Sequence, residues 1–165
     1  MPKGIRPTQE KVRKALFDIL GDIEGLSFLE LFAGSGAIGF EALSRGVSEL
    51  VLVECNPDCL LAIRKNIESL KEKACALVPA KAEDAIKRLH TDKRSFDIVF
   101  FDPPYYRELA KKTLHTLGTY DILSPNGFIV VQHFKKDDLP EHLGVFSLFR
   151  TAFYGDTVLS FYRKA

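Results

Sequence analysis

The chain has 165 residues, a formal net charge of +1, and 46% hydrophobic and 27% charged side chains. This composition is ordinary for a single globular domain and excludes a disordered chain, and the small net charge excludes a global attraction to nucleic acid. The longest apolar runs, such as residues 98–101, are too short to cross a bilayer, and the first residues lack the apolar stretch of a signal peptide. Three cysteines, an odd number, do not make a disulfide framework. We therefore expect a cytoplasmic protein without membrane contact.

Residues 1–20 are expected to form a basic arm and a helix. Apolar side chains at helical spacing predict a helix over residues 8–20, with Thr8 as its N-cap. Against the single acid Glu10, residues 1–14 carry five basic side chains: Lys3, Arg6, Lys11, Arg13 and Lys14. A basic arm of this kind can bind phosphate, although a solvated helix face has the same pattern.

Residues 26–165 alternate strand and helix in one Rossmann-like core. Apolar runs predict strands over residues 27–32, 49–53, 74–78, 96–101 and 128–132, with helices over 37–44, from 57 onward, 82–89 and 107–117, and a turn at 124–127. Two last strands, near residues 145–153 and 157–162, are separated by only three residues and must pair antiparallel. The expectation is a single α/β domain with a seven-stranded, mostly parallel sheet, a C-terminal antiparallel hairpin and helices on both faces.

A glycine loop follows the first predicted strand. Gly34, Gly36 and Gly39 fit the G-x-G-x-x-G pattern of dinucleotide-binding loops, which is weak when it stands alone. Two residues between strand and first glycine lengthen the loop, and Glu30 at the strand end would repel a pyrophosphate. The Glu30 carboxylate could instead receive the cationic part of S-adenosylmethionine, directly or through water.

A second acid, Glu54, lies at the tip of the second predicted strand. It follows Gly36 by 18 residues, where an acid accepts the ribose hydroxyls of an adenosine-containing ligand. A surface glutamate at a strand end is common, so the assignment depends on the glycine loop before it. Asn56 fits a helix cap better than a ligand contact.

The third motif, Asp102-Pro103-Pro104-Tyr105, directly follows the buried fourth strand. Because ligands bind beyond the carboxyl ends of strands in open α/β sheets, these residues are expected in the site. The Asp102 carboxylate and the Pro103 carbonyl could hold the two protons of an exocyclic base amine, and Tyr105 could stack on the base. A tight turn with an exposed tyrosine is the structural alternative.

Other polar residues are less informative. Cys55 and Cys59 have no further ligand at zinc spacing, so we expect no metal. The four histidines are scattered, and His133 alone could face the site, while Asp156 fits turn chemistry better than catalysis.

These motifs carry a family resemblance. The order of residues 31–36, Glu54 and residues 102–105 resembles the Asp/Asn-Pro-Pro-Tyr class of amino-methyltransferases. More closely, the chain resembles the bacterial 16S rRNA guanine-N2 methyltransferase family, through the segments Arg6-Pro-Thr8, Val12-Arg13, Leu16-Phe17, 40–46 and 154–157.

The resemblance implies a class I methyltransferase fold, S-adenosylmethionine as methyl donor, and a guanine of 16S rRNA or of an assembling small ribosomal subunit as acceptor. It implies a catalytic box of Asp102, Pro103, Pro104 and Tyr105. The expected cofactor contacts are Glu30, Phe32, Ala33, Gly34, Ser35, Gly36, Glu54, Cys55, Ala82 and Asp102, and the expected RNA contacts are Arg6, Thr8, Lys11 and Arg13. Lys81 departs from the Asp or Asn with which relatives accept the adenine amino hydrogen, because a lysine cannot accept a hydrogen bond. We expect a monomer.

Three alternatives differ in class. A DNA adenine-N6 methyltransferase shares the Asp-Pro-Pro-Tyr box but usually needs an extra recognition domain, for which 165 residues leave no room. A nicotinamide-dependent oxidoreductase is disfavoured by Glu30 and by the lack of a second domain. A catalytically silent RNA-binding subunit is disfavoured because the whole catalytic box is present.

Overall fold

The computed structural model describes residues 7–70, 74–105 and 108–164, with residues 7 and 8 described in their backbone only. Its helices are α1 (Pro7–Leu20), α2 (Ala37–Ser44), α3 (Pro57–Leu70), α4 (Ala82–Thr91) and α5 (Leu109–Thr119). Its strands are β1 (Ser27–Leu31), β2 (Glu49–Glu54), β3 (Cys75–Pro79), β4 (Phe96–Phe101), β5 (Leu123–Phe134), β6 (His142–Leu143), β7 (Phe146–Tyr154) and β8 (Thr157–Lys164).

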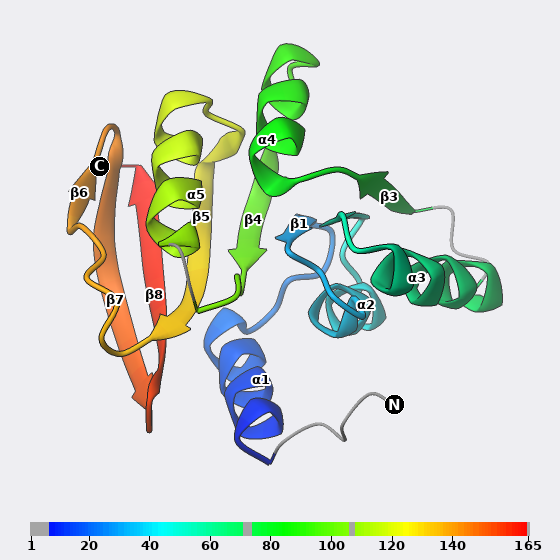
Figure 1. Cartoon of the computed structure of the whole chain (residues 1–165), viewed down its shortest axis with the longest axis horizontal. Helices are drawn as coiled ribbons and strands as arrows, with labels where there is room; N and C mark the ends of the chain where they lie inside the picture. Colours follow the sequence, from blue (N-terminus) through cyan, green and yellow to red (C-terminus); the bar gives the residue numbers. More distant parts are fainter. Residues whose placement is uncertain (1–6, 71–73, 106–107, 165) are drawn as a thin grey trace.

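These strands form one sheet in the order β3-β2-β1-β4-β5-β8-β7-β6. β1 to β5 pair in parallel, whereas β8 runs antiparallel between β5 and β7 (Figure 1). The chain first moves outward from β1 to β3 and then returns to add β4 on the other side of β1. Ligands of open α/β sheets bind beyond the carboxyl ends of the strands at such a reversal, so the topology places the candidate site at the ends of β1 and β4.

Helices cover both faces of the sheet, as the sequence predicts. On one face, α1, α2 and α3 bury apolar side chains against the sheet, among them Leu16, Ala42 and Ile63. On the other face, α4 and α5 do so through residues such as Ile86 and Leu114. Because both faces of the central strands are covered, β4 is an almost continuous apolar run, which explains its sequence.

Three sequence-based expectations are corrected. The sheet has eight strands rather than seven, because β6 is a two-residue strand too short to leave a sequence pattern. The α1 helix begins at Pro7, so Thr8 lies within it and is not the N-cap. The predicted turn at residues 124–127 lies inside β5: Phe96 pairs with Leu123 and Ile98 with Phe128, so four residues bulge out opposite one.

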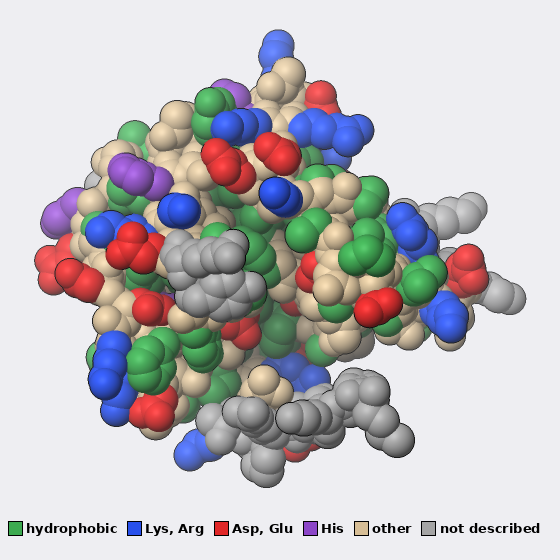
Figure 2. All heavy atoms as spheres, viewed as in Figure 1, with side chains coloured by type: hydrophobic (Ala, Val, Ile, Leu, Met, Phe, Trp, Pro, Cys, Tyr) green, Lys and Arg blue, Asp and Glu red, His purple; other side chains and the backbone are tan. Residues whose placement is uncertain are grey.

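Among the described residues, no helix combines the length and apolar character needed to cross a membrane. Acidic and basic side chains are interspersed over the face shown in Figure 2, in line with the small net charge.

Candidate active site

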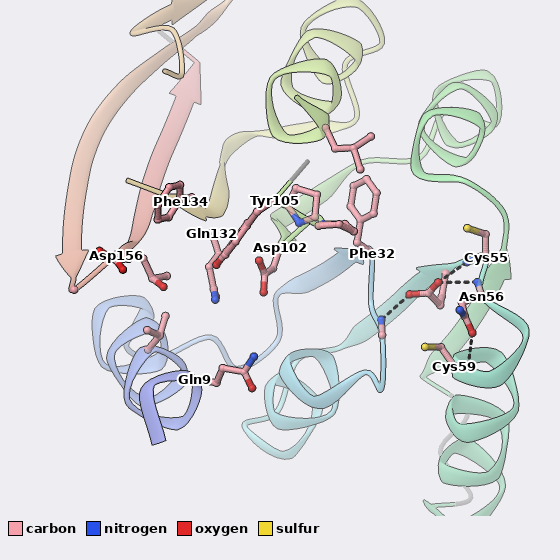
Figure 3. Close-up of a pocket in the computed structure, with 18 residues that line it drawn as sticks. Gln9, Phe32, Cys55, Asn56, Cys59, Asp102, Tyr105, Gln132, Phe134 and Asp156 are labelled. Carbon is pink, nitrogen blue, oxygen red and sulfur yellow. Dashed lines mark hydrogen bonds between the residues drawn. The ribbon is translucent and has the colours of Figure 1, made fainter. Parts of the chain in front are cut away.

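A cavity of about 1100 Å³ lies at the carboxyl ends of the central strands. It brings together α1, the loop after β1, the end of β2, the segment after β4, the end of β5 and the turn between β7 and β8 (Figure 3). Eight of the predicted site residues line it: Phe32, Gly34, Glu54, Cys55, Asp102, Pro103, Pro104 and Tyr105. The three motifs that are far apart in the sequence therefore share one cavity.

The glycine loop turns sharply between β1 and α2. Phe32, Gly34 and Gly36 all have positive φ angles, of 53°, 59° and 80°, and the Gly36 amide donates to the Ala33 carbonyl at 2.8 Å. Gly36 also lacks space, since a Cβ there would come within 2.7 Å of the Phe40 ring. Ala33 and Gly36 are buried behind the cavity, whereas Ser35 is exposed. The loop thus presents backbone rather than side chains at Gly34, as a closely approaching ligand requires.

The Glu54 carboxylate ties this loop to the end of β2. Its Oε1 accepts a hydrogen bond from the Gly34 amide at 2.8 Å, and its Oε2 accepts from the amides of Cys55 and Asn56, each at 2.8 Å (Figure 3). Asn56 caps α3, because its Oδ1 accepts from the amides of Asp58 and Cys59. The sequence-based interpretation of Asn56 as a helix cap is confirmed.

Glu30 lies deeper, with only 4% of its surface exposed. Its Oε2 accepts a hydrogen bond from the Gly39 amide at 2.7 Å. Burial raises the pKa of Glu30 to about 8, and the nearby Asp102 and Glu54 carboxylates add to this, against the lowering effect of the Gly39 amide. Glu30 is not among the residues that line the cavity, and its side chain instead holds the Gly39 amide at the start of α2.

Asp102 and Tyr105 project from the segment after β4. Burial raises the pKa of Asp102 to about 7, so the carboxyl is poised to change protonation near neutral pH. The Tyr105 ring is 53% exposed and stacks against Phe134 with ring centroids 6.1 Å apart and planes inclined by 28°. Burial also raises the pKa of the Tyr105 hydroxyl, while hydrogen bonds with Thr157 and Gln132 oppose this.

The end of β5 contributes residues that the sequence did not single out. Gln132 and Phe134 line the cavity, and Figure 3 shows the Gln132 amide and the Asp102 carboxylate pointing into the same space. His133 lies between them on the other face of the strand, because side chains alternate along β5. Its Nε2 pairs with the Ser160 hydroxyl at 2.7 Å, its Nδ1 with the Phe134 carbonyl at 3.0 Å, and burial lowers its pKa. The suggestion that His133 faces the site is wrong.

A second cavity, of about 420 Å³, adjoins the first, and both are lined by Phe32, Glu54, Cys55 and Leu109. It opens between the start of α4 and α5 and is lined by Ala82, the predicted adenine contact, and by Lys81. Lys81 has extended backbone and is exposed, and its side chain makes no capping bond to α4. The two cavities thus lie side by side, one reaching Asp102 and the other the N-terminus of α4.

The charges around the larger cavity favour a cationic ligand. Its described lining includes the carboxylates of Glu54, Asp102 and Asp156 but neither Lys nor Arg. Asp156 is held in the β7–β8 turn by a 2.8 Å ion pair with Lys135, as well as lining the cavity. A pyrophosphate would find no positive side chain on these walls, whereas the sulfonium and amino groups of S-adenosylmethionine would find acids. The described residues also contain no group of three or more His, Cys, Asp or Glu placed to hold a metal ion.

The predicted RNA contacts are only partly described. Arg6 lies outside the described residues, as does the side chain of Thr8. Lys11 is exposed on α1, and Arg13 forms a 3.8 Å ion pair with Glu41. The same helix also reaches the larger cavity through Gln9 and Val12.

Known proteins resemble the chain over almost its full length. YlbH of Bacillus subtilis is 34% identical over 96% of this chain and 88% of its own length. Ribosomal RNA small subunit methyltransferase D of Escherichia coli is 32% identical over 98% of this chain and 80% of its own length. The solved structure of Escherichia coli yhhF, 32% identical, superposes with a TM-score of 0.85 over 99% of this chain and 89% of its own.

The fold is therefore that of class I methyltransferases, as the resemblance implied. The family model described as Conserved hypothetical protein 95 matches residues 1–163. That match spans the glycine loop, both acids and the Asp-Pro-Pro-Tyr box, and the chain belongs to this family.

Proposed function

We propose that the chain is an S-adenosylmethionine-dependent methyltransferase that modifies the N2 amine of a guanine in small-subunit ribosomal RNA. The observation that carries the proposal is the position of Asp102, a partly buried carboxyl that lines a cavity shared with the glycine loop and Glu54. The similarity to a ribosomal RNA small subunit methyltransferase supports the substrate class. The choice of guanine N2 rests on the resemblance to the 16S rRNA guanine-N2 methyltransferase family alone.

The residues present fit the methyl donor. S-adenosylmethionine, when bound, supplies an electrophilic methyl group on a cationic sulfonium. The acids of the larger cavity suit that positive charge, and Glu54 at the end of β2 suits the ribose hydroxyls. The smaller cavity, with Ala82 at its wall, suits the adenine ring. The backbone amide of Ala82 could donate a hydrogen bond to a ring nitrogen of the adenine, whereas the Lys81 side chain cannot accept a hydrogen bond from the adenine amino group.

The Asp-Pro-Pro-Tyr segment is assigned to the acceptor amine. An exocyclic amine is a poor nucleophile because its lone pair is delocalised into the ring of the base. The Asp102 carboxylate and the Pro103 carbonyl are two acceptors for its two protons, which orients the lone pair and stabilises the positive charge that develops on nitrogen. With a pKa of about 7, Asp102 is ionised in a large fraction of molecules at neutral pH and can also take up the proton that the amine loses.

Tyr105 and Phe134 are assigned to the base itself. Their rings stack at a centroid distance of 6.1 Å at the mouth of the cavity, so either face is a platform on which a flipped-out base could lie. Gln132 adds a donor and an acceptor beside Asp102, which suit the polar edge of a base.

The test is to offer the protein methyl-labelled S-adenosylmethionine with unmodified small ribosomal subunits, naked 16S rRNA or duplex DNA, and to identify the labelled nucleoside. N2-methylguanosine from RNA is the expected product. Label in N6-methyladenine would replace the proposal by a DNA or RNA adenine enzyme. Label in no acceptor, with the cofactor still bound, would favour a silent RNA-binding subunit.

The matched variants are Asp102→Asn and Asp92→Asn, the second exposed at the end of α4. Loss of turnover in Asp102→Asn alone, with the cofactor still raising the melting temperature, is the expected pattern. Strong residual turnover in Asp102→Asn would remove the role given to this carboxyl.

A further inference from the structure

An aromatic and basic surface lies on the antiparallel part of the sheet, outside both cavities. Phe128, Phe149 and Phe161 form a ring cluster with centroid distances of 6.5 Å (Phe128–Phe149), 6.4 Å (Phe128–Phe161) and 6.1 Å (Phe149–Phe161). The Arg163 guanidinium lies 4.6 Å from the centroid of Phe149, and that of Arg150 lies 6.0 Å from the centroid of Phe161. These five residues are called the hairpin surface below.

The hairpin surface shares a face of the sheet with the larger cavity. Side chains alternate along a strand, so Phe128, Gln132 and Phe134 point to the same side of β5, and the last two line the cavity. Phe134 follows Phe128 by six positions, a distance of roughly 20 Å along a strand that rises about 3.3 Å per residue. The hairpin surface and the larger cavity therefore lie on the same side of the sheet, as does helix α1, within the span of a few nucleotides.

Exposure and charge make this surface suited to a ligand. Phe149 is 41% exposed and both arginines are exposed, whereas Phe161 is buried and forms the floor. Within residues 7–70, 74–105 and 108–164, neither Arg150 nor Arg163 takes part in an ion pair. The two guanidinium groups lie over aromatic rings and have no acidic partner in the described chain. Such a surface complements a polyanion that carries planar aromatic groups.

We propose that the hairpin surface binds a single-stranded segment of the acceptor RNA. Unpaired bases stack on aromatic rings and on guanidinium planes, and antiparallel sheets with exposed aromatic residues are a common platform for them. Phe149 with Arg163 supplies the stacking plane, and the two arginines supply phosphate contacts. The inference rests on the proposed function, because the occupant is its substrate.

The test compares Phe149→Leu, Arg163→Gln and the double variant with two matched controls. Phe153→Leu removes a ring that is 69% exposed on the same strand as Phe149. The residues on either side of Phe153, Ala152 and Tyr154, pack on the α1 side of the sheet, so the Phe153 ring points to the opposite face. Arg88→Gln removes an exposed arginine on α4, which covers the opposite face. Binding of fluorescent 16S rRNA fragments is measured over a range of salt concentrations, together with kcat and KM for methylation.

In the double variant, Kd and KM for RNA are expected to rise roughly tenfold with kcat unchanged. In Arg163→Gln, the slope of log Kd against log salt is expected to fall by about 0.7, the value for one lost phosphate contact to a single strand. The controls should remain like the parent protein, and the cofactor should raise the melting temperature of every variant equally, which excludes misfolding.

Unchanged Kd and KM in the double variant of an active enzyme would overturn the proposal while leaving the proposed function standing. A dimer in solution that Phe149→Leu dissociates would also overturn it, since the surface would then be a contact between two copies of this chain. Conversely, an RNA that binds through these residues but is never methylated would support the surface and refute the proposed activity.

Discussion

The Gly34 amide donates a 2.8 Å hydrogen bond to the Oε1 atom of Glu54, and so joins the glycine loop to the end of the neighbouring strand. The same carboxylate accepts the amides of Cys55 and Asn56 through its other oxygen. One side chain therefore joins the glycine loop to the start of α3, and it does so purely as an acceptor because all three partners are N–H donors.

Glu54→Gln is expected to weaken binding of S-adenosylmethionine by about tenfold to a hundredfold and to lower the free energy of unfolding by about 1–3 kcal/mol. Glutamine keeps one acceptor oxygen, but its NH2 group replaces the other and would face one or two backbone N–H donors that it cannot accept. Calorimetric titration and urea unfolding measure the two effects. Glu68→Gln, exposed on α3, is the control, and equal behaviour of the two variants would contradict the role of Glu54.

We expect Asp102 to set the pH dependence of the proposed reaction. Burial raises the pKa of this carboxyl to about 7, and in the proposed mechanism the ionised form accepts the amine protons. The value of kcat/KM should therefore rise about tenfold per pH unit below pH 7 and become constant above it. In Asp102→Asn this rising limb should vanish and kcat should fall by about a hundredfold or more. A flat profile between pH 5 and 8 in the parent protein would refute this assignment.

Glu30 sets part of the pH dependence of stability. Burial raises its pKa from 4.5 to about 8 in the folded protein, so the folded state holds a proton that the unfolded state releases first. The corresponding stability is complete below about pH 4.5 and is lost as the pH rises through about 8, by at most about 1.4 kcal/mol per pH unit.

The measurement is urea unfolding of the parent protein and of Glu30→Gln at pH 5, 7 and 9. Because glutamine does not titrate, the variant should gain stability relative to the parent as the pH rises. A stability difference that stays constant across the three pH values would show that Glu30 keeps an ordinary pKa.

Gly39 packs where α2 crosses the sheet. A Cβ at this position would come within 2.6 Å of Leu52, 2.8 Å of Glu30 Oε2 and 2.9 Å of Leu50. Gly39→Ala should therefore cost about 1–3 kcal/mol of stability by overpacking. In contrast, Gly118→Ala in α5 meets nothing closer than 3.4 Å and should be neutral or stabilising by up to about 1 kcal/mol. Thermal unfolding of both variants tests the contrast, and equal losses would contradict it.

Strong local signals made most of the fold predictable from the sequence. The glycine loop, the Asn56-Pro57 helix start and the apolar run of β4 each lie within one element and follow directly from backbone chemistry. The turn residues at 124–127 form a bulge within β5 rather than a turn before it. A Cβ at Gly127 would lie 2.8 Å from the Asp97 carbonyl oxygen, so this bulge against β4 requires a glycine. Such a contact depends on a neighbouring strand, which the local pattern does not contain.

Part of the candidate site was also predictable from the sequence, and part of it was not. Residues 32–36, Glu54 and residues 102–105 stand beside strand ends, where position alone suggests a role. Gln132 and Phe134 stand inside an apolar strand, and their role comes from which face of β5 looks toward the cavity. His133, between these two residues, was a candidate because histidines often act in catalysis. The alternation of side chains along β5 places it on the other face, where it pairs with Ser160.

The position of β8 has a consequence for how the protein is made. This strand comes last in sequence among the described strands, yet it lies between β5 and β7. Until the ribosome has synthesised it, β5 keeps an unpaired edge, and Thr157, which lines the cavity, has not joined the site. The nascent chain therefore cannot complete the larger cavity until the β7–β8 hairpin has been inserted, because the turn and the start of β8 form part of its wall.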